Sequence, residues 1–119
     1  MSANIANNTV DAGSGNSGIL LYTSAGTVSG TVTGNTTTNA TTDGIATFRA
    51  GGGSITLNAS ENTSTNNING FYLHSNPSTV DLGGGSLGSI GENRVFNSST
   101  ADIENDTGAV VSAVNNWFG

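Results

Sequence analysis

Short apolar runs, separated by stretches of glycine, serine, threonine and asparagine, follow one another along the whole chain. Three of these runs begin with glycine and span residues 18–22, 44–48 and 70–74. In a strand, alternate side chains of such a run would point to opposite faces. The apolar residues are mostly Ile, Val, Leu and Phe, which favour strands over helices. The pattern therefore predicts an all-β chain without any helix of more than about two turns.

A tetrad recurs five times: an apolar or small residue, two variable residues and then asparagine. The asparagines lie 27, 27, 31 and 23 residues apart, at Asn8, Asn35, Asn62, Asn93 and Asn116. A period in the twenties with short strands between turns is typical of a solenoid, whose stacked coils bury one another's inward residues. We predict a single domain, residues 1–119, folded as a right-handed parallel β-helix of about four to five coils.

The repeated asparagine has two physical uses at a corner between strands. Asparagine tolerates the left-handed backbone conformation better than most residues, so it can turn the chain sharply. Identical asparagine side chains, stacked coil on coil, can also hydrogen-bond along the stack. We therefore predict that the five repeated asparagines form a structural ladder.

Alternation within the glycine-led runs separates an inward from an outward set. The inward residues are Ile19, Leu21, Ile45, Thr47, Phe71, Leu73, Ile103 and Asn105. The outward residues are Leu20, Tyr22, Ala46, Phe48, Tyr72, His74, Glu104 and Asp106. The reverse assignment would bury the histidine together with two acids, which is unfavourable without partners.

The spacing of 31 comes from an insertion between His74 and Asn93 that contains three consecutive glycines, Gly83, Gly84 and Gly85. Glycine-rich segments cradle phosphates in nucleotide-binding proteins, but no Gly-Lys-Ser/Thr follows and no helix is predicted here. We interpret the insertion as a tight loop.

The charge balance excludes two classes of partner. Eight acids stand against Arg49 and Arg94, for a net charge of −6, and the chain has no lysine. Nucleic acids and anionic membranes are therefore not expected partners, because both require clustered cations. The chain also lacks cysteine, which excludes disulfides and thiolate metal sites. No run is long enough for a transmembrane helix, and the start has no signal-peptide pattern.

Several segments resemble a known superfamily. Residues 32–37 (Val-Thr-Gly-Asn-Thr-Thr) and 18–21 (Gly-Ile-Leu-Leu) resemble repeats of the pectate-lyase-like right-handed parallel β-helix superfamily. Residues 80–93 and 111–119 are similar to the last coils of bacterial secreted and surface β-helix proteins. The resemblance covers essentially the whole chain and implies the C-terminal part of a longer solenoid. It does not select a function, because the superfamily includes lyases, hydrolases, adhesins and inert shafts.

Catalytic chemistry has few candidates in this chain. Glu61 and Glu92 share one column, each directly before its asparagine, and two stacked carboxylates can hold a cation. The alternative is that both are solvated turn residues. His74 is the only histidine, and its default interpretation is an outward surface residue. We therefore predict no enzymatic activity, no cofactor and no metal.

Two outer surfaces are candidate binding faces. Tyr22, Phe48 and His74 would form an outward column with Tyr72 beside it, suited to sugar rings or to a partner. Alternatively, these aromatics only stabilise the strands or lie under a loop. A second face carries threonines that resemble ice-binding ladders, or that merely reflect strand preference: Thr9, Thr36, Thr38, Thr63 and Thr65.

The function that we expect is a non-enzymatic structural or surface-recognition (adhesive) module of an exported bacterial protein, outside the cell or on its surface. The alternatives are an ice- or glycan-binding face and the remnant of a polysaccharide-active enzyme. Ile5 and Val10 would be exposed at the N-terminal end, where another copy could pair end to end. Phe118, in the inward column, and Trp117, over the last coil, would cap the other end.

Overall fold

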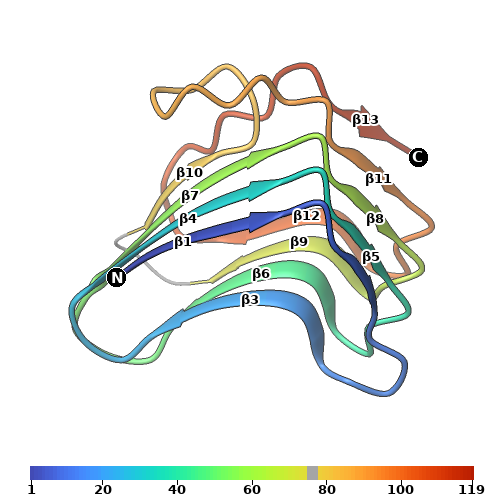
Figure 1. Ribbon diagram of the computed structural model, residues 1–119, viewed down its shortest axis with the longest axis horizontal. Helices are drawn as coiled ribbons and strands as arrows, with labels where there is room; N and C mark the ends of the chain where they lie inside the picture. The colour runs from blue at the N-terminus through green and yellow to red at the C-terminus, as the bar shows by residue number, and fades with distance from the viewer. Residues whose placement is uncertain (75–77) are drawn as a thin grey trace.

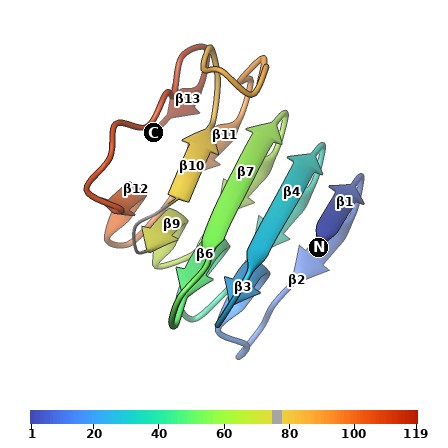
Figure 2. The same cartoon turned by 90° about the vertical axis from the view of Figure 1, so that its left-hand side faces the viewer.

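The computed structural model describes residues 1–74 and 78–119, and within these ranges it contains strands and no helix. The strands wind as a right-handed parallel β-helix whose stacked coils form three parallel sheets, one along each side (Figures 1 and 2). The predicted fold is thereby confirmed. No helix of the described residues is long and apolar enough to cross a membrane.

Each sheet takes one strand from every coil and pairs it in parallel with the equivalent strand of the next coil. The first sheet contains β1 (Ser2–Ala6), β4 (Thr27–Thr33), β7 (Ser54–Ser60) and β10 (Ser78–Asp81). The second contains β2 (Thr9–Asp11), β5 (Thr36–Thr38), β8 (Thr63–Thr65), β11 (Arg94–Phe96) and β13 (Trp117–Phe118). The third contains β3 (Ser17–Thr23), β6 (Asp43–Arg49), β9 (Asn69–His74) and β12 (Ala101–Asp106).

The core is a stack of inward columns with one layer per coil. In the third sheet Ile19, Ile45 and Phe71 lie in register, and all three are buried. The inward assignments of the first three glycine-led runs are confirmed, since every one of these side chains is buried. In β12, Ile103 is half-buried against the core, whereas Asn105 is exposed although it lies in register with Leu73.

The five repeated asparagines form a continuous hydrogen-bonded ladder at the corner between the first and second sheets. Asn8 Nδ2 donates to Asn35 Oδ1 at 3.0 Å, and the same bond repeats at 2.9–3.0 Å through Asn62, Asn93 and Asn116. Each acceptor oxygen also receives the backbone N–H of the preceding asparagine in the ladder. The amide groups thus bind neighbouring coils together, and the three central ones, Asn35, Asn62 and Asn93, are buried.

The prediction that the ladder asparagines themselves adopt the left-handed conformation is wrong. The positive φ falls one residue earlier, at Asn7 (57°), Gly34 (67°), Glu61 (58°), Glu92 (61°) and Asn115 (60°). The reason is that the ladder side chain must point inward to reach the next coil, so the preceding residue makes the turn. A second set of positive-φ asparagines follows the strands of the second sheet, at Asn39, Asn66 and Asn97.

The glycines that lead the third sheet are required by close packing rather than by backbone conformation. A Cβ atom at Gly44 would collide with Ser64 Oγ, and one at Gly70 would collide with Val95 Cγ1. These neighbours are inward residues of the second sheet. Glycine therefore lets the two sheets meet at a sharp corner.

The two ends differ from their predicted roles in two respects: Trp117 lies elsewhere, and Ile5 and Val10 are half-buried rather than exposed. Phe118 pairs in register with buried Val95, in the inward column. Trp117 does not lie over the last coil. It pairs in register with Arg94 on the outer side, and its ring packs edge-on against that of Phe96 at a centroid distance of 5.6 Å. At the other end β1, β2 and β3 are the edge strands of their sheets, and Ile5 and Val10 are half-buried.

Candidate functional site

The outer face of the third sheet is hollowed into a concavity of about 480 Å³. Ala46 lies in register between Leu20 on one neighbouring strand and Tyr72 on the other. Because alanine has the shortest side chain of the three, the column is indented at β6. Ala46 is buried although it points outward, since its larger neighbours surround it.

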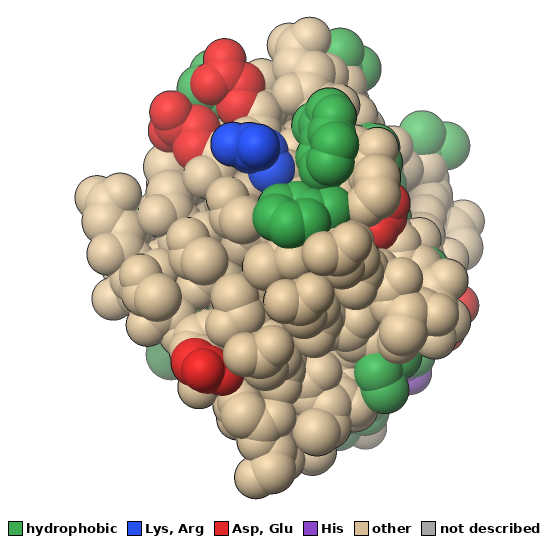
Figure 3. Space-filling model, turned by 90° about the vertical axis from the view of Figure 1, so that its right-hand side faces the viewer, with side chains coloured by type: hydrophobic (Ala, Val, Ile, Leu, Met, Phe, Trp, Pro, Cys, Tyr) green, Lys and Arg blue, Asp and Glu red, His purple; other side chains and the backbone are tan. Residues whose placement is uncertain are grey.

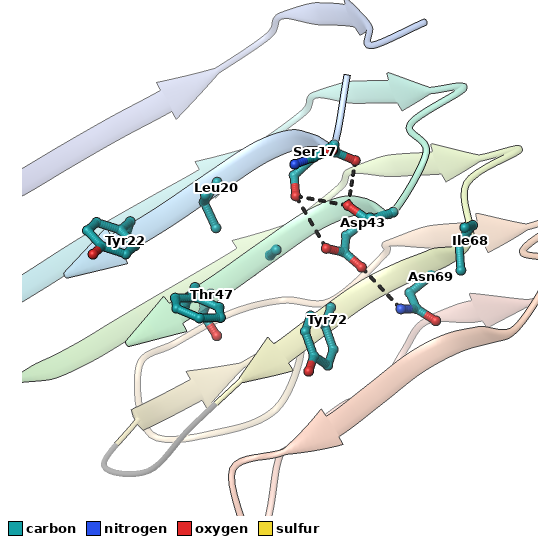
Figure 4. A pocket seen from close by; sticks show the side chains of 12 residues that line it. Ser17, Leu20, Tyr22, Asp43, Thr47, Ile68, Asn69 and Tyr72 are labelled. Atoms are coloured by element: carbon teal, nitrogen blue, oxygen red, sulfur yellow. Dashed lines mark hydrogen bonds between the residues drawn. The ribbon is translucent and has the colours of Figure 1, made fainter. Parts of the chain in front are cut away.

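The hollow has a polar end built by the first residues of three adjacent strands (Figure 4). Ser17 Oγ donates to Asp43 Oδ2 at 3.3 Å, and Asn69 Nδ2 donates to Asp43 Oδ1 at 3.1 Å. Asp43 is 6% exposed and Asn69 is 7% exposed. A carboxylate is therefore held almost out of water at this end, by two neutral side-chain donors.

One atom of this polar end lacks a partner. Asn69 Oδ1 is buried and accepts no hydrogen bond from the described part of the chain. In the next coil Asn69 pairs with Ala101, whose side chain has no donor, so the polar column of β3, β6 and β9 stops there. Leaving a buried carbonyl oxygen unpaired is unfavourable by ~1–3 kcal/mol, so the unpaired Oδ1 of Asn69 requires an explanation.

The predicted aromatic column is present beside the hollow. The rings of Tyr22 and Phe48 stack at a centroid distance of 6.0 Å, and those of Phe48 and His74 at 4.4 Å. The interplanar angles of 12° and 8° mean that these rings cover one another's faces. The ring surfaces that face one another in this stack are therefore not free to stack on a ligand.

Tyr72 stands on the opposite side of the hollow from Leu20 and lies close to acidic groups. Burial raises the pKa of Tyr72 to about 12, together with the hydrogen bond that its hydroxyl donates to Asp106 Oδ2 at 3.1 Å and the charge of nearby carboxylates. The phenol is consequently neutral at any ordinary pH. Its ring is tilted by 56° from that of His74, at a centroid distance of 5.6 Å.

The glycine-rich insertion does form an anion cradle, but its anion is the chain's own Asp81. The Asp81 carboxylate is 1% exposed and accepts backbone N–H bonds of 2.9–3.2 Å from Gly83, Gly85, Leu87 and Ser89. Burial alone would raise the pKa of this carboxyl, yet the four N–H groups outweigh it and hold the pKa below 3.8. The insertion forms a tight loop because it folds around the buried charge of Asp81.

The threonine face lies on the second sheet, whose surface is mainly uncharged and polar, with apolar side chains and a basic one gathered toward one end (Figure 3). Thr9, Thr36 and Thr63 lie in register, and Thr38 lies in register with Thr65. Their exposure is uneven: Thr9 is exposed, Thr65 is buried and the other three are half-buried. The threonines thus do not form a uniformly exposed array.

The stacked glutamates occupy turn positions. Glu61 and Glu92 are exposed and have positive φ, and the N–H of Glu61 donates to the carbonyl of Gly91 at 2.8 Å. Residues 1–74 and 78–119 contain no group of three or more His, Cys, Asp or Glu side chains that could hold a metal ion. This arrangement matches solvated corner residues.

The structure adds Ser17, Asp43, Asn69 and Ala46 to the aromatic residues that the sequence suggested. The first three could have been found, because each directly precedes one of the leading glycines, Gly18, Gly44 and Gly70. The indentation at Ala46 could not, since it depends on the sizes of its neighbours in two other coils.

The family comparison covers the whole chain. A family model described as "Protein of unknown function (DUF1565)" matches residues 1–119. No curated protein and no solved structure gives a significant match.

Proposed function

The chain belongs to the DUF1565 family, and we propose that it is a non-enzymatic surface-recognition module that binds a glycan in the hollow of the third sheet. The observation that carries the proposal is the juxtaposition of an apolar, partly aromatic wall with a buried carboxylate and amide. A sugar ring has the matching chemistry, because its faces carry C–H groups and its rim carries hydroxyls.

The dimensions support a small ligand. Adjacent strands lie ~4.8 Å apart, so Leu20 and Tyr72 stand on strands ~10 Å from one another across Ala46. The volume of about 480 Å³ falls within the ~300–1,000 Å³ range of small-molecule sites. One ring of a saccharide chain can enter this space while its neighbours remain on the surface.

The composition of the lining supports binding rather than catalysis. Among the described residues that line the hollow, Asp43 has the single carboxyl group, and none is a histidine or an arginine. Acid–base catalysis on glycans ordinarily uses a pair of carboxyl groups. The resemblance to bacterial secreted and surface β-helix proteins supports an exported setting within the pectate-lyase-like superfamily.

Binding to a glycan array, followed by isothermal titration calorimetry, tests the proposal. Ala46→Leu fills the indentation without touching the polar end, so it should abolish binding while leaving the circular dichroism spectrum unchanged. Thr36→Val, on the second sheet, is the control and should bind normally. A protein that binds no glycan, or an Ala46→Leu variant that binds as well as the wild type, would refute the assignment.

The other expected functions have less support from the surface. Ice binding favours a flat array of exposed threonines, and the five threonines differ in exposure. End-to-end pairing of two copies through β1, β2 and β3 is a separate expectation, supported by the open edge of all three sheets. Light scattering tests it: an oligomer that survives Ile5→Lys combined with Val10→Lys would contradict pairing at this end.

A further inference from the structure

We propose that the preferred ligand of the hollow is an amino sugar carrying a protonated amine, with the ammonium group placed at the polar end formed by Ser17, Asp43 and Asn69. This inference rests on the proposed glycan-binding function and specifies its substrate class. It follows from three properties of the polar end: its hydrogen-bonding groups, its charge and its place beside an apolar wall.

The polar end offers mainly hydrogen-bond acceptors to a ligand. The Ser17 hydroxyl hydrogen is used toward Asp43, and the Thr42 hydroxyl donates to the carbonyl of Asn16 at 2.6 Å. The two hydroxyl oxygens therefore present only lone pairs to a ligand, and the Asp43 carboxylate presents its unused lone pairs as well. Asn69 adds Oδ1, which is buried and without a donor among the described residues.

Such a set selects a ligand rich in donors. An ammonium group brings three N–H donors and no acceptor, whereas a sugar hydroxyl brings one donor together with lone pairs that face other acceptors. The ammonium group would bind the Asp43 carboxylate, and the hydrogen bond from Asn69 Nδ2 to Asp43 Oδ1 would remain in place.

The charge of the polar end points the same way. Asp43 and Asp81 are both buried carboxylates, but from the described residues Asp81 accepts four backbone N–H bonds, whereas Asp43 accepts two bonds from neutral side chains. Buried charges ordinarily require compensation. A cation in the hollow would supply it, and the stacked strand β12 adds Glu104 next to Tyr72.

The protein's own cations lie elsewhere. Neither Arg49 nor Arg94 lines the hollow, and Arg49 Nη1 donates to the carbonyl of Gly51 at 2.7 Å. Leu20, Phe48 and Tyr72 also line the hollow, and their apolar surface gives no partner to an ammonium group alone. It therefore favours a cation that carries a ring over a bare metal ion or a simple amine.

Calorimetry with three β-1,4-linked tetramers tests the inference, since glucosamine, N-acetylglucosamine and glucose share one backbone and differ at one position. We expect the glucosamine tetramer to bind at least ten-fold more tightly than the other two. Asp43→Asn should remove this preference. Glu61→Gln removes one negative charge at a distant corner and should retain the preference, which separates the site from the general acidity of the chain.

The outcomes separate the two proposals. Equal affinity for the glucosamine and glucose tetramers, or a preference that survives Asp43→Asn, would overturn the amino-sugar inference while leaving glycan binding intact. Absence of binding to all three tetramers, with no hit on the array, would overturn both. If Asp43→Asn fails to fold, Ala46→Leu decides: an undiminished affinity for the glucosamine tetramer in this variant would place the amine outside the hollow and refute the inference.

Discussion

Replacing Asn62 with alanine tests the asparagine ladder at its centre. The Asn62 side chain is fully buried, its Nδ2 donates to the carbonyl of Val32 at 2.8 Å, and its Oδ1 accepts the N–H of Asn35 at 3.0 Å. Alanine would leave these two backbone groups without the amide that pairs them. Each unpaired buried group is unfavourable by ~1–3 kcal/mol, so we expect a loss of about 4 kcal/mol in the free energy of unfolding.

The matched control is Asn39→Ala, because Asn39 is exposed and its amide makes one side-chain bond, to Asp11 Oδ1 at 3.1 Å. Its positive φ of 58° still favours asparagine over alanine, so this change should be unfavourable by ~1 kcal/mol. Urea unfolding followed by circular dichroism measures both variants, and an unchanged dependence on urea would show that stability alone differs. Losses that agree within ~0.5 kcal/mol would refute the ladder as a source of stability, since that is the ordinary scatter of surface substitutions.

Three further changes test the cradle, the turns and the corner. Asp81→Asn should destabilise the native state by ~3 kcal/mol at neutral pH, because an amide cannot accept all four N–H bonds. The pKa of Asp81 in the folded state lies below the ordinary value of 3.8, so its stabilisation is present above that pH and disappears as the pH falls through the lowered pKa. The urea unfolding curves of the wild type and of Asp81→Asn should therefore converge in acid. A difference that persists there would contradict this account. Glu61→Asn should stabilise by roughly 0.5–1 kcal/mol, because asparagine tolerates a positive φ better, whereas a lower melting temperature would indicate that the glutamate does more than turn the chain. Gly44→Ala should lose ~3 kcal/mol or more through overpacking, while Gly52→Ala, with open space around its Cβ, should melt within a few degrees of the wild type; similar melting temperatures would argue against the steric corner.

The period of the solenoid and its inward columns could be predicted from the sequence, because both are set by residues that repeat. Every coil must bury a similar layer, so positions such as Ile19, Ile45 and Phe71 reappear with similar character. The asparagines of the ladder were visible for the same reason: each one bonds to its own counterpart in the next coil. A repeated contact leaves a repeated pattern.

The turns and the site depend on information that does not repeat. Which residue takes the left-handed conformation is decided by the direction in which the ladder side chain must point, so Glu61 rather than Asn62 makes the turn. The hollow arises because one coil places a small residue, Ala46, between larger ones in its neighbours. Chain order does not reveal this difference in size, since the three residues meet only when the coils stack in register.

The same division holds for the two buried carboxylates. The sequence by itself determined a parallel β-helix with an acidic, lysine-free surface, and it marked the glycine-rich insertion as a loop. Only the tertiary structure decided that Asp81 is surrounded by four N–H groups, whereas Asp43 borders a hollow with two neutral donors. The physical reason is that the state of a buried charge depends on the donors around it, and those donors come from backbone turns and neighbouring coils that assemble only when the chain has folded.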